Sequence, residues 1–114
     1  MDKQRLNELA ELARRVRVGI IDAVYSASSG HPGGSLSIAD ILTYLYFEEL
    51  RVDPANPDAP DRDRFVLSKG HCAPALYSIL AQRGFIPVED LKTFRKTTSD
   101  LQGHPDMKRG RAHV

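Results

Sequence analysis

The sequence predicts a mainly helical fold with one short strand, and three observations indicate this. Apolar residues recur at steps of three and four along three segments of the 114-residue chain, which is the spacing of one helix face. The apolar run RFVLS, residues 64–68, is long enough for a buried strand and too short for a helix. Hydrophobic residues make up 41% of the chain and charged residues 27%, which is typical of a globular protein with a packed core.

The first predicted helix runs from Leu6 to Val24. Its buried face is predicted from seven apolar positions: Leu6, Leu9, Ala10, Ala13, Val16, Ile20 and Val24. Gly19 lies within this helix, where glycine costs about 1 kcal/mol relative to alanine. Gly30, followed two residues later by Pro32, predicts the end of the helix and places His31 in a loop.

A second helix is predicted from near Ser37 to near Leu50. Ser37 and Asp40 have the spacing of a capping box, and an apolar stripe follows them. Residues 53–63 then carry three prolines with acidic residues between them, which predicts an irregular surface linker.

Two further helices are predicted after the short strand. Pro74 suits a first helical position and Gly84 suits a helix end, so the third helix lies between them. A short fourth helix opens at Pro87, because acidic residues follow in its first turn and basic residues near its last, the order that the helix dipole favours. The remaining chain is predicted to be loop, ending in an irregular tail over residues 105–114.

The single strand leaves two interpretations of the fold open. A buried strand needs neighbouring strands, because its backbone donors and acceptors must be paired. Either the domain is mostly helical and residues 64–68 pack irregularly, or these residues belong to a sheet that is incomplete in this chain.

Charge and composition exclude several classes of partner. The chain has 16 basic and 15 acidic residues, so its net charge of +1 gives no electrostatic footprint for nucleic acid or an anionic membrane. No apolar run approaches the about 20 residues that span a bilayer. A single cysteine excludes an intrachain disulfide, and the N-terminus lacks the apolar region of a secretory signal, so a cytoplasmic protein is expected.

Three of the four histidines directly follow glycine: His31, His71 and His104. Proline follows the first and the last of these, which restrains the loops that carry them. Taken together, they predict imidazoles held around one polar pocket. Gly33 and Gly34 would let the main chain approach a ligand there, although spacing alone is explained slightly better by an ordinary turn between helices.

Two uses of such a histidine cluster compete. Three neutral imidazoles can bind a catalytic zinc ion, but the long separations between these histidines match no short metal motif. Hydrogen bonding and proton transfer to a phosphorylated, polyhydroxylated substrate suit histidine, and Lys69 could add positive charge. Cys72 is interpreted as a small buried hydrophobe, because a side chain adjacent to His71 in sequence need not face it.

Three stretches carry a family resemblance: SSGHPGGSLSIADIL, DRFVLSKGHCAPALY and LQGHPD. In this order they resemble the N-terminal region of transketolases, over roughly Leu6 to Met107. The second stretch is most similar to the split form, in which one short subunit holds the diphosphate-binding domain. The resemblance implies an α/β fold, with residues 1–114 as a partial thiamine diphosphate-binding domain.

The resemblance also implies roles for the glycine-flanked histidines. Transketolases use thiamine diphosphate to move a two-carbon ketol unit from a ketose phosphate to an aldose phosphate in pentose phosphate metabolism. By position, His31 would face the substrate and assist proton transfer, and His104 would contact the donor ketose. His71 would lie beside the cofactor diphosphate, with Gly70 giving the main chain clearance. The implied partners are a C-terminal transketolase subunit and a second copy of the protein.

The chain also departs from the family pattern. The glycine-rich stretch after the third histidine and the Gly-Asp-Gly element that holds the divalent cation, magnesium, are absent, so no metal ligand is assigned. The activating glutamate of the pyrimidine domain is absent too. A truncated chain that is inactive alone is therefore expected. The alternatives are a non-catalytic fragment that docks on a thiamine-dependent partner and, least favoured, a three-histidine zinc hydrolase.

Overall fold

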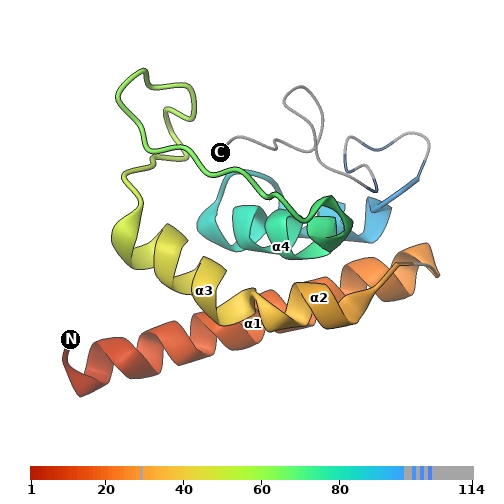
Figure 1. Ribbon diagram of the computed structural model, residues 1–114, viewed down its shortest axis with the longest axis horizontal. Coiled ribbons are helices and arrows are strands. Elements are labelled where there is room, and N and C mark those ends of the chain that lie inside the picture. The colour runs from red at the N-terminus through yellow and green to blue at the C-terminus, as the bar shows by residue number, and fades with distance from the viewer. Residues whose placement is uncertain (29, 97–98, 100, 102, 104–114) are drawn as a thin grey trace.

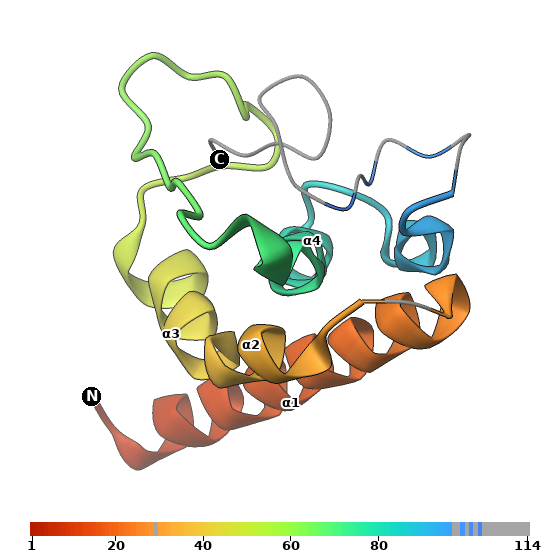
Figure 2. The same cartoon turned by 45° about the vertical axis from the view of Figure 1, so that its right-hand side comes forward.

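The computed structural model describes residues 1–28, 30–96, 99, 101 and 103. Its elements, in chain order, are the helices α1 (Lys3–Ala27), α2 (Pro32–Ser37) and α3 (Ala39–Tyr44), the π-helix η1 (Leu45–Glu49), the 3₁₀ turn η2 (Gly70–Cys72), the helix α4 (Ala73–Arg83) and the 3₁₀ helix η3 (Val88–Thr93). The long helix α1 forms a base, and α2, α3, α4 and η3 all pack on it (Figure 1). Figure 2 shows α4 nearly end-on above α1.

The first predicted helix is confirmed, and it is longer at both ends. The side chain of Asp2 accepts a hydrogen bond from the Arg5 amide at 2.8 Å and so caps the N-terminus of α1. The middle of the predicted face is buried, but Leu6, at 53% exposure, and Ala10 are exposed. The first turns of α1 extend beyond α4, so α4 does not cover them (Figure 1).

The second helix is predicted to start near Ser37, and α3 begins two residues later, at Ala39, which confirms that start. The short helix α2 in front of it was not predicted. Helical backbone already begins at Pro32, with His31 as the residue before it, and breaks at Ile38 before α3 begins. Ser37 does not cap a helix, because its hydroxyl donates instead to the carbonyl oxygen of Gly34 at 2.8 Å. The predicted end near Leu50 is confirmed, since η1 ends at Glu49.

Both later helices are confirmed. Helix α4 carries Pro74 in its first turn and ends at Gly84, whose φ of 101° is the left-handed conformation that glycine adopts without strain. The fourth helix is η3, which follows Pro87 and has the tighter 3₁₀ geometry. Every residue from 73 to 81 is buried, so α4 forms the centre of the molecule.

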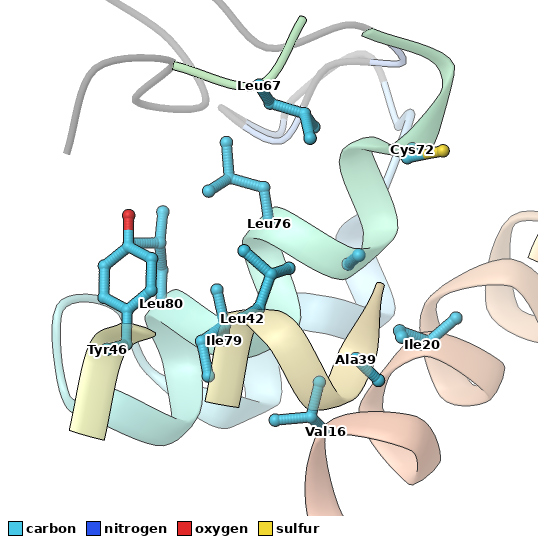
Figure 3. Close-up of a cluster of buried hydrophobic side chains, with 11 residues drawn as sticks. Val16, Ile20, Ala39, Leu42, Tyr46, Leu67, Cys72, Leu76, Ile79 and Leu80 are labelled. Atoms are coloured by element: carbon cyan, nitrogen blue, oxygen red, sulfur yellow. The ribbon is translucent and has the colours of Figure 1, made fainter. Parts of the chain in front are cut away.

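The main hydrophobic core lies where α1, α3 and α4 meet (Figure 3). Its fully buried side chains include Val16, Ile20, Leu42, Tyr46, Leu76, Ile79 and Leu80. A second cluster joins α1, α4 and η3, where the rings of Tyr77 and Phe94 meet edge to face at 5.9 Å between centroids. These two clusters hold α4 against α1, α3 and η3.

The predicted strand at residues 64–68 is not formed within the part of the chain that the structure describes. Leu67 packs into the core, whereas Val66 is 60% exposed and has only an isolated β-bridge. A strand requires a ladder of backbone pairs, and the other described segments form no strand that could supply one. Of the two interpretations of this segment, irregular packing therefore applies to the described residues, and the incomplete sheet is not seen there.

Residues 53–63, predicted as a surface linker, form an irregular loop with closed ends. The amide and guanidinium of Arg51 donate to the carboxylate of Asp63 at 2.7 and 3.1 Å, and the Asp63 amide donates to the Arg51 carbonyl oxygen at 3.0 Å. The predicted tail, residues 105–114, lies outside the described residues. None of the helices in the described ranges is long and apolar enough to cross a membrane.

Two arginines satisfy backbone carbonyls at the end of η1, where no further helical amides are available. Arg83 of α4 donates to the carbonyl oxygens of Tyr46 and Val52 at 2.9 and 3.2 Å, and its guanidinium lies 5.8 Å from the centroid of the Phe47 ring. Arg5 of α1 donates to the carbonyl oxygen of Phe47 at 2.9 Å. The end of η1 is thus held to both α1 and α4.

Candidate functional site

Two of the three glycine-histidine motifs meet in space. The position that a β-carbon on Gly34 would occupy lies 3.5 Å from Nε2 and 3.7 Å from Cδ2 of His71. The same position lies 2.7 Å from Sγ of Cys72, which is closer than a real β-carbon could approach. A residue larger than glycine at position 34 would therefore separate α2 from η2.

A lysine connects the same two motifs by hydrogen bonds. Nζ of Lys69 donates to the carbonyl oxygen of Gly34 at 3.0 Å and to Oγ of Ser37 at 3.3 Å. The Ser37 hydroxyl donates to the same carbonyl oxygen at 2.8 Å. The sequence suggested Lys69 only as a source of charge, and no local pattern predicts contacts with residues more than thirty positions away.

His31 lies at the start of α2 because of the residue that follows it. Pro32 disfavours helical backbone at the preceding position, and His31 has φ −121° and ψ 102°. Pro32 itself occupies the first turn of α2, where its missing amide costs no helical hydrogen bond. The His31 side chain is exposed.

His71 occupies the centre of η2, between half-buried Gly70 and fully buried Cys72. The ring of His71 is exposed, so it can meet a ligand while its neighbours fix the turn. The complete burial of Cys72 confirms the interpretation of this cysteine as a small hydrophobe.

The third motif histidine, His104, lies outside the described residues. The convergence of three imidazoles on one pocket therefore stays a prediction. Sequence reasoning also missed Ser35, whose hydroxyl is completely buried and has no hydrogen-bond partner among the described residues. The only sequence signal for it was its place directly after the two glycines.

The described residues suit an anionic ligand better than a metal ion. His71 supplies an exposed imidazole, and Gly33 an open main chain, with no atom within 4 Å of where its β-carbon would be. The ammonium of Lys69, which donates to Gly34 and Ser37, adds a positive charge beside them. These donors fit the phosphate oxygens of a diphosphate group. Within the same part of the chain, no three His, Cys, Asp or Glu side chains are grouped so that they could hold a metal ion.

Known proteins are similar to this chain over nearly its whole length. Residues 9–113 match the family model described as transketolase, thiamine diphosphate binding domain. The chain is 46% identical to the transketolase of Mus musculus over 107 residues, which is 94% of the chain. It is 43% identical over 109 residues, or 96% of its length, to the 6-deoxy-6-sulfo-D-fructose transketolase subunit SqwG of Clostridium sp. (strain MSTE9).

A solved structure shows the same arrangement of elements. The transketolase of Campylobacter jejuni superposes with a TM-score of 0.86 at 41% identity and covers 98% of this chain. The chain spans 17% of the length of the mouse and Campylobacter proteins and 39% of the Clostridium subunit.

Proposed function

Because this chain belongs to the transketolase family, we propose that it is the N-terminal part of an enzyme that transfers ketol units between sugar phosphates. The reaction would move a two-carbon unit from a ketose phosphate to an aldose phosphate. The observation that carries this proposal is the contact between the two glycine-histidine turns, in which Lys69 and His71 flank the open main chain of α2.

The proposed site has a diphosphate end and a sugar end. His71, on the turn that Gly70 begins, would donate to a diphosphate oxygen of thiamine diphosphate. When bound, this cofactor supplies the carbanion chemistry that breaks and forms the carbon–carbon bond. His31 and His104 would face the sugar, where an imidazole can accept and return a hydroxyl proton.

The chain would act only with the remainder of the enzyme. A diphosphate group carries several negative charges, and in the family a divalent cation, magnesium, offsets them. The relatives above are much longer than this chain, and one of them is named as a subunit. We therefore propose a C-terminal transketolase subunit as the partner, with two copies of each chain in the assembly.

A reconstitution experiment tests this function. The chain is captured with a partner that supplies the parts it lacks, which are the Gly-Asp-Gly cation element and the pyrimidine-binding domain. The pair is then assayed for ketol transfer with magnesium and thiamine diphosphate. We expect turnover that is lost in His31→Asn and in His71→Asn. His113→Asn, at a histidine with no assigned role, is the matched control. A pair that binds but transfers no ketol unit contradicts the enzymatic role.

A second candidate is a non-catalytic fragment that docks on a thiamine-dependent partner. The exposed apolar side chains of α1 and α3 favour it, since Tyr25 is 82% and Ile41 is 59% exposed. The same experiment separates the two functions, because a docking fragment predicts binding without turnover.

A further inference from the structure

We propose that Lys69 is a positioning residue that holds α2, the short helix after His31, against η2, the turn that carries His71. Its ammonium group joins the two turns through the Gly34 carbonyl oxygen and the Ser37 hydroxyl. The catalytic consequence rests on the proposed function, whereas the structural connection does not depend on it.

The three polar groups form a closed set of hydrogen bonds. Lys69 donates two bonds, at 3.0 and 3.3 Å, and the Ser37 hydroxyl donates to the carbonyl oxygen that Lys69 also contacts, at 2.8 Å. An ammonium has three donors and no acceptor, so Lys69 can hold both oxygens at once. Bonds from a charged donor are also stronger than those between neutral groups.

The short length of α2 explains why Lys69 donates to the Gly34 carbonyl oxygen. The last four carbonyls of a helix lack partners within it, and in this helix, Pro32–Ser37, they include that of Gly34. A cation placed at the C-terminal end of a helix is also favoured by the helix dipole. Lys69 therefore satisfies a carbonyl of α2 while it stands two residues before His71.

Packing on the other side of Gly34 makes this connection specific. Sγ of Cys72 and the ring of His71 occupy the space beside the α-carbon of Gly34, so the turn is held by apolar contact and by Lys69 together. If Lys69 were lost, the contact with Cys72 would remain, but the start of α2 could rotate about it. The expected effect is a displacement of His31 relative to His71, without loss of the fold.

Nuclear magnetic resonance of the full 114-residue chain tests the connection. Lys69→Met should shift the amide signals of residues 33–37 and the side-chain signals of His71, and Lys69→Arg should restore part of each shift. Lys92→Met, at an exposed lysine of η3, is the matched control and should leave them unchanged. Unchanged signals of residues 33–37 in Lys69→Met would overturn the proposal.

A double-mutant cycle provides the second readout. Lys69→Met and Ser37→Ala remove partners of one connection, so their effects on the unfolding equilibrium constant should not multiply. The unfolding equilibrium constant of the double mutant should differ by about threefold or more from the value that multiplied single-mutant effects would give, as for residues in direct contact. Effects that multiply within error would show that Lys69 and Ser37 act independently and would contradict the proposal.

Turnover by the reconstituted pair separates positioning from direct binding. A displaced His31 should lower kcat by about tenfold or more with little change in KM for the acceptor sugar, and Lys69→Arg should recover activity. A rise in KM with unchanged kcat would instead make Lys69 a direct ligand and overturn the positioning role. If the unaltered pair shows no ketol transfer, the proposed function fails, while the resonance shifts and the cycle still decide the connection.

Discussion

Gly19 of α1 lies directly against Ser78 of α4. A β-carbon on Gly19 would lie 2.2 Å from Oγ of Ser78, and that hydroxyl donates to the carbonyl oxygen of Val16 at 2.7 Å. The absence of a side chain on α1 thus allows α4 to approach closely enough for a buried hydrogen bond between the helices. The cost of glycine within a helix, about 1 kcal/mol, is offset by this contact.

Gly19→Ala should therefore destabilise the protein although alanine is the better helix former. The added carbon must displace Ser78 and break its bond to Val16, so we expect a loss of about 1–3 kcal/mol in the free energy of unfolding. Urea denaturation followed by circular dichroism measures it. Gly33→Ala is the control, because its β-carbon would meet nothing within 4 Å and should leave stability unchanged or raise it. Equal stability of both variants would contradict the close contact.

Arg83→Met should loosen the end of η1. Methionine keeps the apolar stem but leaves the carbonyls of Tyr46 and Val52 without the guanidinium, and we expect about 1–2 kcal/mol lower stability. Thermal unfolding measures the change. Arg14→Met is the matched control, because Arg14 is exposed and pairs with Glu11 in a surface ion pair, which contributes little to stability. If Arg83→Met lowers the stability no more than Arg14→Met does, the hydrogen bonds from the Arg83 guanidinium to these carbonyls do not stabilise the fold.

The sequence predicted the helices whose signals are local. The spacing of apolar residues in α1, and Pro74 and Gly84 at the ends of α4, depend only on nearby residues, so both helices were found. The start near Ser37 agrees with α3, but the separate short helix that begins at Pro32 was missed, because the glycines after Pro32 were interpreted as a turn. The strand at residues 64–68 was predicted from an apolar run alone, but Phe65 and Leu67 pack on the core without forming a strand.

The candidate site could be predicted only in part, for the same reason. Glycines next to His31 and His71 marked both turns, and the structure brings the first turn beside the ring of His71. The bond from Lys69 to Gly34 joins residues 35 positions apart and depends on how α2 packs on η2, which no local pattern encodes. Tertiary packing also decides that the Ser35 hydroxyl is buried.

The pairing of Arg51 with Asp63 should make the closure of the loop depend on pH. Hydrogen bonds from the side chain and amide of Arg51 lower the pKa of Asp63 below its ordinary value of 3.8. Because the pKa of Asp63 is lower in the folded state than in the unfolded chain, its ionised carboxylate stabilises the fold. This stabilisation is complete at pH values above the unfolded-state pKa, and it is lost as the pH falls through the folded-state pKa. The contribution of the Asp63 carboxylate to loop closure should therefore be lost only below about pH 4. The backbone bond from the Asp63 amide to the Arg51 carbonyl oxygen does not titrate and should remain.

Titration of the Asp63 carboxyl carbon by nuclear magnetic resonance checks this. Arg51→Met should raise the midpoint of Asp63 toward the ordinary value. Glu11, whose pKa is lowered to about 2 chiefly by the hydrogen bond from Arg14, should keep its midpoint in this variant. A midpoint of Asp63 that does not move in Arg51→Met would rule out the guanidinium as the cause.

The chain by itself should bind magnesium thiamine diphosphate weakly or not at all. The described residues offer few donors to a highly charged diphosphate, and they contain no group of side chains that could hold the cation. Isothermal titration calorimetry of the isolated chain measures this, with the reconstituted pair as the positive control. Micromolar, magnesium-dependent binding by the chain alone would refute the prediction.

The exposed apolar ridge of α1, formed by Val18, Ile21 and Tyr25, should bind a hydrophobic dye and promote self-association. These side chains are 47%, 48% and 82% exposed, and their spacing places them on one face of the helix. Replacing all three with glutamine should lower dye fluorescence and the apparent mass at high concentration. Stability should be kept, because glutamine is a good helix former and none of the three residues is in the core.

The matched control for the ridge is a triple glutamine variant at Glu11, Arg14 and Arg15 of the same helix. It removes two surface ion pairs without changing apolar exposure, so dye fluorescence should stay as in the unaltered chain. Sedimentation velocity then compares the three proteins at equal concentration. An unaltered chain that stays monomeric and binds no dye would mean that this ridge needs no cover, and the case for a larger assembly built on it would fail.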